Sequence, residues 1–173
     1  MARPSFSHKV PEGDNRPRRV CDACGFVDYV NPRIVVGAVC AWDARVLLCR
    51  RAIEPRRGFW TIPAGFLEEA ESVEAGVQRE AWEEARADIE LEGLLGVYSV
   101  PRISQVQIMF RARLRSPDVS AGEESLEVGL FEWAAIPWDD LAFPSVHWAL
   151  RDFDAVRGQA VFPTRSNPPG TLG

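Results

Sequence analysis

The stretch 65–87, GFLEEAESVEAGVQREAWEEARA, constrains the fold of this 173-residue chain more than any other segment. Ser72 can cap a helix that runs to about Arg86, because a serine hydroxyl accepts a hydrogen bond from an orphan amide of the first turn. At about 100° per residue, small and apolar residues fall on one side of this helix. These residues are Val73, Gly76, Val77 and Ala81. We therefore expect this side to face a hydrophobic core.

Three glutamates lie on or beside the same apolar side, with Glu80 and Glu84 in its middle and Glu83 at its edge. The alternative is a solvated acidic face, but such a face should lie opposite the apolar stripe. Carboxylates three and four residues apart repel one another, and burial raises that cost. A hard cation such as Mg²⁺ or Mn²⁺ removes the repulsion, since these ions prefer oxygen ligands and share substrate phosphates. The pattern therefore predicts a metal site.

The segment resembles the Nudix box, G-x5-E-x7-R-E-U-x-E-E-x-G-U, in which U is a bulky apolar residue. The positions that match are Gly65, Glu71, Arg79, Glu80, Glu83 and Glu84. Ala81 and Ala87 are smaller than the pattern's apolar residues, and Arg86 replaces its second glycine. That glycine ends the helix in the family, so we expect Arg86 to lengthen or reshape the turn. A 23-residue pattern with every charged position filled is far more specific than a lone glycine motif.

The resemblance implies the Nudix fold, which is an α/β (α+β) arrangement with a mixed β-sheet sandwiched between helices. It also implies metal-dependent hydrolysis of a phosphoanhydride bond, with Mg²⁺ or Mn²⁺ as cofactor. The metal ligands that it implies are the Gly65 carbonyl, Glu80, Glu83 and Glu84. Arg79 is expected to pair with Glu71 or Glu83 and so to orient the carboxylates.

The resemblance leaves the general base open, because in the family the base lies either in the box or in the loop before a later strand. The candidates are therefore Glu83, Glu127 and Glu124, and a plain surface role is the alternative for the last two. Gln105 matches a glutamine of FAD-cleaving relatives and is a candidate substrate contact. Arg51 flanks the loop before the box, where a guanidinium group could meet a substrate phosphate.

The sequence around the box is most similar to a plant and bacterial subgroup that hydrolyses FAD or ADP-ribose-type dinucleotides and releases AMP. Pro101 nearly matches a proline of ADP-ribose enzymes, and the S-Q-P-W-P-F-P motif of NADH-cleaving relatives is absent. The alternatives are a Nudix-fold ligand-binding regulator, or a hydrolase of nucleoside triphosphates or NADH. The complete set of box glutamates favours an enzyme.

The N-terminal segment carries a C-x2-C knuckle, Cys21-Asp22-Ala23-Cys24. It resembles the second half of a zinc ribbon that precedes the Nudix domain in one subgroup. A structural zinc site needs four ligands, and His8 is the only nearby residue that could add to the two cysteines. Zinc is therefore a doubtful cofactor at Cys21 and Cys24; a knuckle-shaped turn without zinc and a true start further upstream are both open.

The composition limits the classes of partner that the chain is expected to bind. A net charge of -5 argues against nonspecific nucleic-acid binding, which needs a basic surface. No apolar run approaches the roughly 18 residues of a membrane span, and no signal peptide is evident. We therefore expect a cytoplasmic protein with a small nucleotide as substrate and no nucleic-acid or membrane partner; a homodimer is left open.

We divide the chain into a zinc-ribbon remnant (1–32), a Nudix hydrolase domain (33–160) and a flexible tail (161–173). Residues 1–19 are polar and proline-containing, and we expect no regular element there. The expected strands of the domain are 34–42, 46–49, 89–100, 103–114 and 128–133. A second helix is expected at 145–156, and the last residues are expected to form a loose tail.

Overall fold

The computed structural model describes residues 4–171, so the predictions for residues 1–3 and 172–173 lie outside the described residues. The chain divides after Pro32 into two compact units. The first unit is an antiparallel sheet in the order β1-β2-β3. Its strands are β1 (Phe6–Lys9), β2 (Arg18–Cys21) and β3 (Val27–Asp28).

The expectation that residues 1–19 form no regular element is wrong. β1 pairs with β2 along its whole length, with Phe6 opposite Cys21 and Lys9 opposite Arg18. The connection between them is closed by Asp14, whose carboxylate accepts hydrogen bonds from the amides of Asn15 (2.7 Å) and Arg16 (3.1 Å). Pairing with a distant strand and an aspartate-closed turn thus override the weak local preference of this segment.

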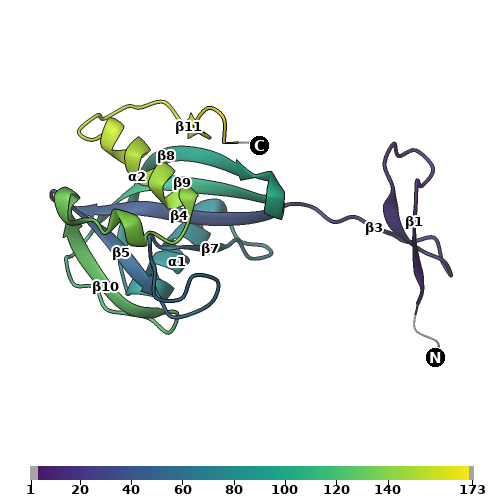
Figure 1. The fold of residues 1–173 in the computed structure, drawn as a ribbon, viewed down its shortest axis with the longest axis horizontal. Helices are drawn as coiled ribbons and strands as arrows, with labels where there is room; N and C mark the ends of the chain where they lie inside the picture. Colours follow the sequence, from purple (N-terminus) through teal and green to yellow (C-terminus); the bar gives the residue numbers. More distant parts are fainter. Residues whose placement is uncertain (1–3, 172–173) are drawn as a thin grey trace. The chain divides into compact units, whose positions relative to one another are not determined.

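The second unit contains an eight-stranded mixed sheet and two α-helices (Figure 1). Its strands are β4 (Arg33–Trp42), β5 (Arg45–Arg51), β6 (Trp60–Thr61), β7 (Ala64–Phe66), β8 (Ile89–Val100), β9 (Gln105–Leu114), β10 (Ser125–Glu132) and β11 (Arg165–Ser166). The helices are α1 (Val73–Ala85) and α2 (Pro144–Ala155), with short 3₁₀ turns η1 (Pro101–Ile103), η2 (Trp133–Ala135) and η3 (Trp138–Asp140). The sheet order is β10-β5-β4-β9-β8-β11; β6 adds to β5 and β7 to β4.

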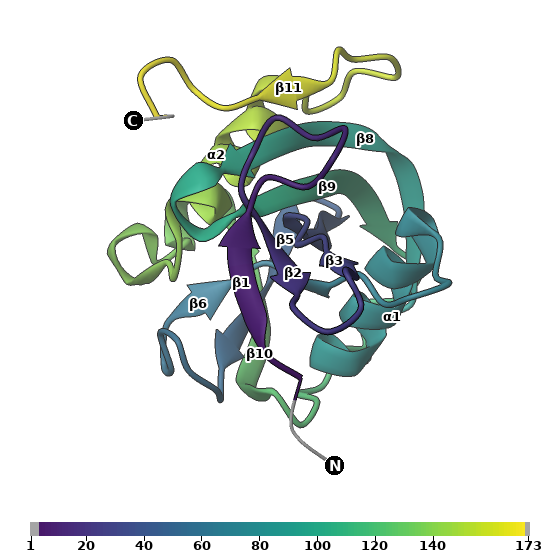
Figure 2. The same cartoon turned by 90° about the vertical axis from the view of Figure 1, so that its right-hand side faces the viewer.

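The two helices cover opposite faces of this sheet (Figure 2). Side chains alternate along β4 because successive residues of a strand point to opposite faces. Val36 and Ala38 pack in one cluster with Val77 of α1, whereas Val39 packs in a second cluster with Leu150 of α2. The predicted mixed sheet between helices is confirmed.

The central strand β4 runs parallel to β9, whereas β9 is antiparallel to β8 and β10 is antiparallel to β5. In this sheet the first half of β4 lies beside the box. Its first half pairs with β7, which carries Gly65 opposite Val36, and its far end turns into β5. The box therefore begins in β7, beside the central strand of the sheet, and continues into α1.

Two details of the second unit depart from the expected elements. β10 starts at Ser125 and not at Val128, because Ser125 and Glu127 already pair with β5. The segment expected to be a loose tail includes β11, which pairs parallel with β8. Asn167 extends this pairing: its Oδ1 accepts from the Ser99 amide (2.7 Å) and its Nδ2 donates to the Ser99 carbonyl (2.9 Å). No helix within residues 4–171 is long and apolar enough to cross a membrane.

Candidate functional site

The box helix begins and ends through local contacts. The Ser72 hydroxyl accepts a hydrogen bond from the amide of Ala75 (3.2 Å), as expected for an N-cap. The helix ends at Ala85, and Arg86 adopts a left-handed conformation with φ of 51°. Arg86 thus does not lengthen the helix; it takes the backbone conformation for which the box pattern has glycine, at a modest steric cost.

Glu80 and Glu84 are buried on the side of α1 that faces the sheet, with exposed fractions of 8% and 5%. Burial raises the pKa of Glu84 to about 8, and the Glu84 Oε2 accepts a hydrogen bond from the amide of Ala64 (3.2 Å). Burial also raises the pKa of Glu80, although Arg79 opposes that rise. Two carboxyl groups buried side by side favour a compensating positive charge.

Gly65 allows the Glu80 carboxyl group to lie against the backbone of β7. A Cβ atom at position 65 would collide with that carboxyl group. A glycine is therefore required here for a close approach, and its backbone lies next to the carboxylates. Carboxylate oxygens and a backbone carbonyl are the ligands that Mg²⁺ and Mn²⁺ prefer, so the residues present fit such an ion.

Arg79 links the carboxylates of the box. Its guanidinium group makes a bidentate pair with Glu71 (2.8 and 3.0 Å) and donates from Nη1 to Glu80 (2.7 Å) and Glu83 (2.9 Å). It also donates to the Phe66 carbonyl (3.0 Å). The sequence predicts a pair with Glu71 or Glu83, and the structure shows both. Within residues 4–171 no three His, Cys, Asp or Glu side chains already converge on one point.

Replacement of Arg79 should destabilise the protein strongly. The Arg79→Met variant leaves the buried Glu80 carboxylate and the Glu71 carboxylate without their cation, so we expect a loss of about 2 to 4 kcal/mol in the free energy of unfolding. Urea unfolding measures this loss. The control is Arg115→Met, since Arg115 makes only long, exposed pairs with Asp88 and Glu90 and should cost under about 1 kcal/mol. Equal losses in both variants would contradict the structural role of Arg79.

The loop 116–124 folds back onto the C-terminal end of α1. The amides of Ser120 and Gly122 donate to the carbonyls of Ala85 (2.9 Å) and Glu84 (3.0 Å). A Cβ atom at Gly122 would collide with the carbonyl oxygen of Glu83, so this position also requires a glycine. Sequence reasoning missed Gly122, because a lone glycine in a polar loop carries no signal of what it contacts.

Two of the three candidate bases, Glu124 and Glu127, have different surroundings in the structure. The charge of Glu124 makes a minor contribution beside burial to the raised pKa values of Glu80 and Glu84, so Glu124 lies within electrostatic range of the buried carboxyl groups. Its backbone carbonyl accepts a hydrogen bond from the amide of Ala52 (2.8 Å), just after β5. Glu127 instead lies within β10, opposite Arg50, with which it forms an exposed ion pair of 3.5 Å. The expectation that Glu127 lies in a loop before the strand is wrong, because β10 begins at Ser125, three residues earlier than predicted.

The two candidate substrate contacts lie in different places. Arg51 ends β5, donates from Nε to the Pro55 carbonyl (2.8 Å) and lies over the Phe143 ring at 5.2 Å. Its positive charge lowers the pKa of Glu84 against the effect of burial, so the charge of Arg51 acts on that carboxyl group. Gln105 begins β9 and pairs with Arg33, on the face of the sheet opposite to α1. The structure therefore does not bring Gln105 among the carboxylates.

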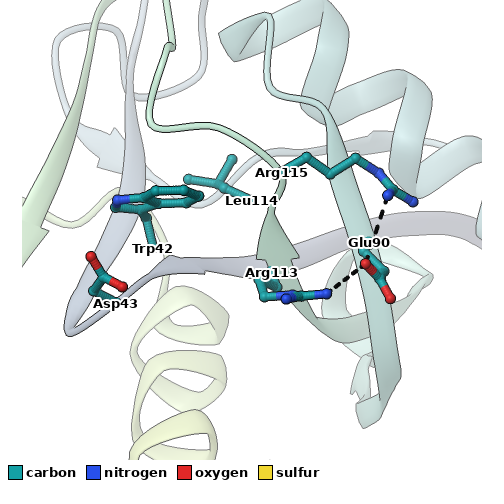
Figure 3. A pocket seen from close by; sticks show the side chains of 6 residues that line it. All are labelled: Trp42, Asp43, Glu90, Arg113, Leu114 and Arg115. Carbon is teal, nitrogen blue, oxygen red and sulfur yellow. Dashed lines mark hydrogen bonds and ion pairs between the residues drawn. The ribbon is translucent and has the colours of Figure 1, made fainter.

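A groove of about 390 Å³ lies at the far ends of β4 and β9 (Figure 3). Along an extended strand, its Trp42 is about 20 Å from Val36, which lies opposite Gly65. The guanidinium groups of Arg113 and Arg115 in this groove pair with Glu90 (2.7 and 3.7 Å). The groove is thus separate from the carboxylate site, and its cations are already paired with a carboxylate.

The cysteine knuckle forms a tight turn in the first unit. The Gly25 amide donates to the Cys21 carbonyl (2.9 Å), and the Cys21 amide donates to the Phe26 carbonyl (2.8 Å). Hydrogen bonds from the backbone of Cys24 and Ala23 lower the pKa of the Cys21 thiol, as suits a thiolate ligand. His8 is exposed and lies opposite Arg19. Described residues thus provide two preorganised thiols for a zinc ion that needs four ligands.

We expect the 173-residue chain to hold less than one zinc ion per chain, because Cys21 and Cys24 supply half of a tetrahedral site. Elemental analysis of protein purified without added metal tests this expectation. One tightly held zinc per monomeric chain would contradict it. The Cys24→Ser variant is the control that separates zinc at the knuckle from zinc bound elsewhere.

Comparisons with known proteins agree with this geometry. The NUDIX domain family matches residues 31–155, and the Nudix N-terminal family, a zinc ribbon, matches residues 4–30. An ADP-ribose pyrophosphatase of Methanocaldococcus jannaschii is 32% identical over 113 residues, 63% of this chain and 67% of that protein. A MutT-like protein of Streptomyces ambofaciens is 40% identical over 124 residues, 72% of this chain and 76% of that protein. The crystal structure of a NUDIX hydrolase from Nitrosomonas europaea superposes with a TM-score of 0.88 at 44% identity, and the match covers 95% and 94% of the two chains.

Proposed function

This chain belongs to the Nudix hydrolase family, and we propose that it cleaves the pyrophosphate bond of ADP-ribose or FAD and releases AMP. One observation carries the proposal: Glu80 and Glu84 are buried on one side of α1, with Glu80 against the backbone of Gly65 and Glu84 accepting from the amide of Ala64. Such a cluster is suited to a pyrophosphate substrate, whose two phosphates need positive charge that this acidic protein does not supply by its surface.

The residues that would hold a divalent cation, Mg²⁺ or Mn²⁺, are Glu80, Glu83, Glu84 and the Gly65 carbonyl. When bound, such a cation neutralises phosphate oxygens and makes the attacking water more acidic. Arg79 keeps the Glu80 and Glu83 carboxylates in place through hydrogen bonds of 2.7 and 2.9 Å. The loop around Gly122 fixes the end of the same helix, so the ligands project from a rigid element.

In the proposed reaction, water attacks one phosphorus atom of the bridge and the bond to the bridging oxygen breaks. AMP leaves with one phosphate, and the partner moiety keeps the other. A side chain must accept the proton that the water loses. We assign this role to Glu124, because its charge acts on the buried carboxyl groups and its backbone is held next to β5, whereas Glu127 is paired with Arg50 at the surface. Arg51, near Glu84, is assigned to a phosphate oxygen of the substrate.

Glu124→Gln should therefore lower kcat about a hundredfold or more, which is the usual contribution of a positioned base. Glu127→Gln is the matched control on the neighbouring strand, and we expect less than about a threefold change, since an exposed ion pair contributes little. Steady-state kinetics of both variants with the same substrate measures this difference. A larger loss in Glu127→Gln than in Glu124→Gln would reverse the assignment.

The dinucleotide assignment is supported by the sequence that follows the box and by the similarity to a protein named as an ADP-ribose pyrophosphatase. Comparison of kcat/KM for ADP-ribose, FAD, NADH and a nucleoside triphosphate with Mg²⁺ tests it. We expect ADP-ribose or FAD to be preferred by about tenfold or more. A clear preference for the triphosphate or NADH would reject the assignment while leaving the hydrolase in place.

A further inference from the structure

Gln107 of β9 is a buried polar side chain that the site described above does not use. Its exposed fraction is 9%, and no donor within residues 4–171 hydrogen-bonds to its Oε1 atom. Its Nε2 atom donates to the Oε1 of Gln105 at 3.4 Å. An unpaired buried acceptor costs free energy, and a donor group of a bound ligand would remove that cost.

The sheet register places Gln107 in one row of side chains across four strands. Gln107 pairs with Val35 of β4 and Tyr98 of β8, and Val35 pairs with Phe66 of β7. Directly paired residues point to the same face of a sheet, so Phe66, Val35 and Gln107 share the face opposite to α1. Gln105 lies on this face as well, one step along β9.

Phe66 makes this row a place where a flat ring can bind. It follows Gly65 directly, and 46% of its surface is exposed. The guanidinium group of Arg33 lies over its ring at 5.1 Å. An exposed aromatic ring on the same sheet face as a polar amide pair, with Val35 between Phe66 and Gln107, resembles the stacking surfaces and edge contacts with which proteins hold nucleobases.

We propose that Phe66, Gln105 and Gln107 form the nucleobase subsite, and that Gln107 makes the enzyme prefer adenine over hypoxanthine. This inference rests on the proposed function and names the base that it recognises. The exocyclic amino group of adenine donates to Gln107 Oε1, and Gln105 Nε2 donates to a ring nitrogen beside it. Hypoxanthine carries a carbonyl oxygen in place of the amino group, which leaves Gln107 Oε1 facing another acceptor.

The kinetic test compares ADP-ribose with its inosine analogue. We expect the wild-type enzyme to prefer ADP-ribose in kcat/KM by about 10- to 100-fold, mostly through KM, and Gln107→Leu to lose that preference. Gln78→Leu makes the same chemical change at an exposed position of α1 and should keep it. A wild-type enzyme without a preference, or a Gln107→Leu variant that retains it, would overturn the proposal.

A binding test separates this inference from the proposed function. Calorimetric titration with AMP and IMP needs no turnover, and we expect AMP to bind more tightly by a Gln107-dependent factor. Phe66→Leu, at an exposed position that tolerates change, should weaken both nucleotides by about tenfold, because stacking does not distinguish the bases. Gln107-dependent AMP preference without dinucleotide cleavage would reject only the proposed function. Equal affinities of the wild-type enzyme for AMP and IMP would reject the subsite. Nucleotide affinities that Phe66→Leu leaves unchanged would reject it too, even if Gln107→Leu does not fold.

Discussion

Exhaustive chelation of divalent cations should lower turnover by about a thousandfold or more, and added Mg²⁺ or Mn²⁺ should restore it. The reason is the charge balance of the site. The negative charges of Glu80, Glu84 and Glu124 repel one another, and this repulsion adds to the effect of burial. A pyrophosphate brings further negative charge, so these residues alone cannot bind and activate it. A thousandfold loss corresponds to about 4 kcal/mol of barrier, within the range attributed to metal-ion catalysis.

The chelation experiment needs a control for folding, because the metal-free protein could also lose structure. Circular dichroism in the presence of EDTA should show an unchanged fold, since Arg79 already pairs with Glu71, Glu80 and Glu83. Full turnover after chelation would contradict the role proposed for the divalent cation.

Glu84→Gln should abolish most of the activity while keeping the fold. The amide has the same shape but is neutral, and it can still occupy the position that accepts from the Ala64 amide (3.2 Å). We expect kcat to fall by about three orders of magnitude or more, because a buried carboxylate ligand cannot be replaced by its neighbours. Rates under saturating Mg²⁺ and substrate measure this loss. Gln78→Leu on the exposed side of the same helix should leave kcat within about twofold.

The same variant should alter how the stability of the metal-free protein depends on pH. Burial raises the pKa of Glu84 from an ordinary value of 4.5 to about 8, so the folded state binds a proton more tightly than the unfolded state. The stabilisation from this proton is complete below about pH 4.5 and is lost as the pH rises through 8. Thermal unfolding in EDTA between pH 5 and 9 should therefore show a decline that is weaker in Glu84→Gln. An identical decline in both proteins would contradict the burial of an ionisable Glu84.

The box helix and the central strands could be predicted because their signals are local. Ser72 caps the helix, apolar residues recur at helical spacing, a β-branched run marks β4 and an apolar-rich segment marks β8. The prediction that carboxylates share the apolar side of α1 followed from the same spacing, and the structure buries Glu80 and Glu84 there.

The rest of the site depends on contacts between distant segments, which a single sequence does not display. Gly122 is required by its approach to the Glu83 carbonyl, 39 positions earlier in the chain, and Glu124 reaches the carboxylates only through that loop. β11 forms because Asn167 and the strand pair with β8, although its own sequence is typical of a loop. Gln107 looked like an ordinary strand residue, since its unpaired oxygen is visible only in three dimensions.

The most direct measurement of the central claim is chromatographic identification of the products from ADP-ribose and FAD, with and without Mg²⁺. The account predicts AMP together with the phosphorylated partner, ribose 5-phosphate or FMN, and only in the presence of the cation. Products without AMP, or the same products at the same rate without the cation, would contradict it.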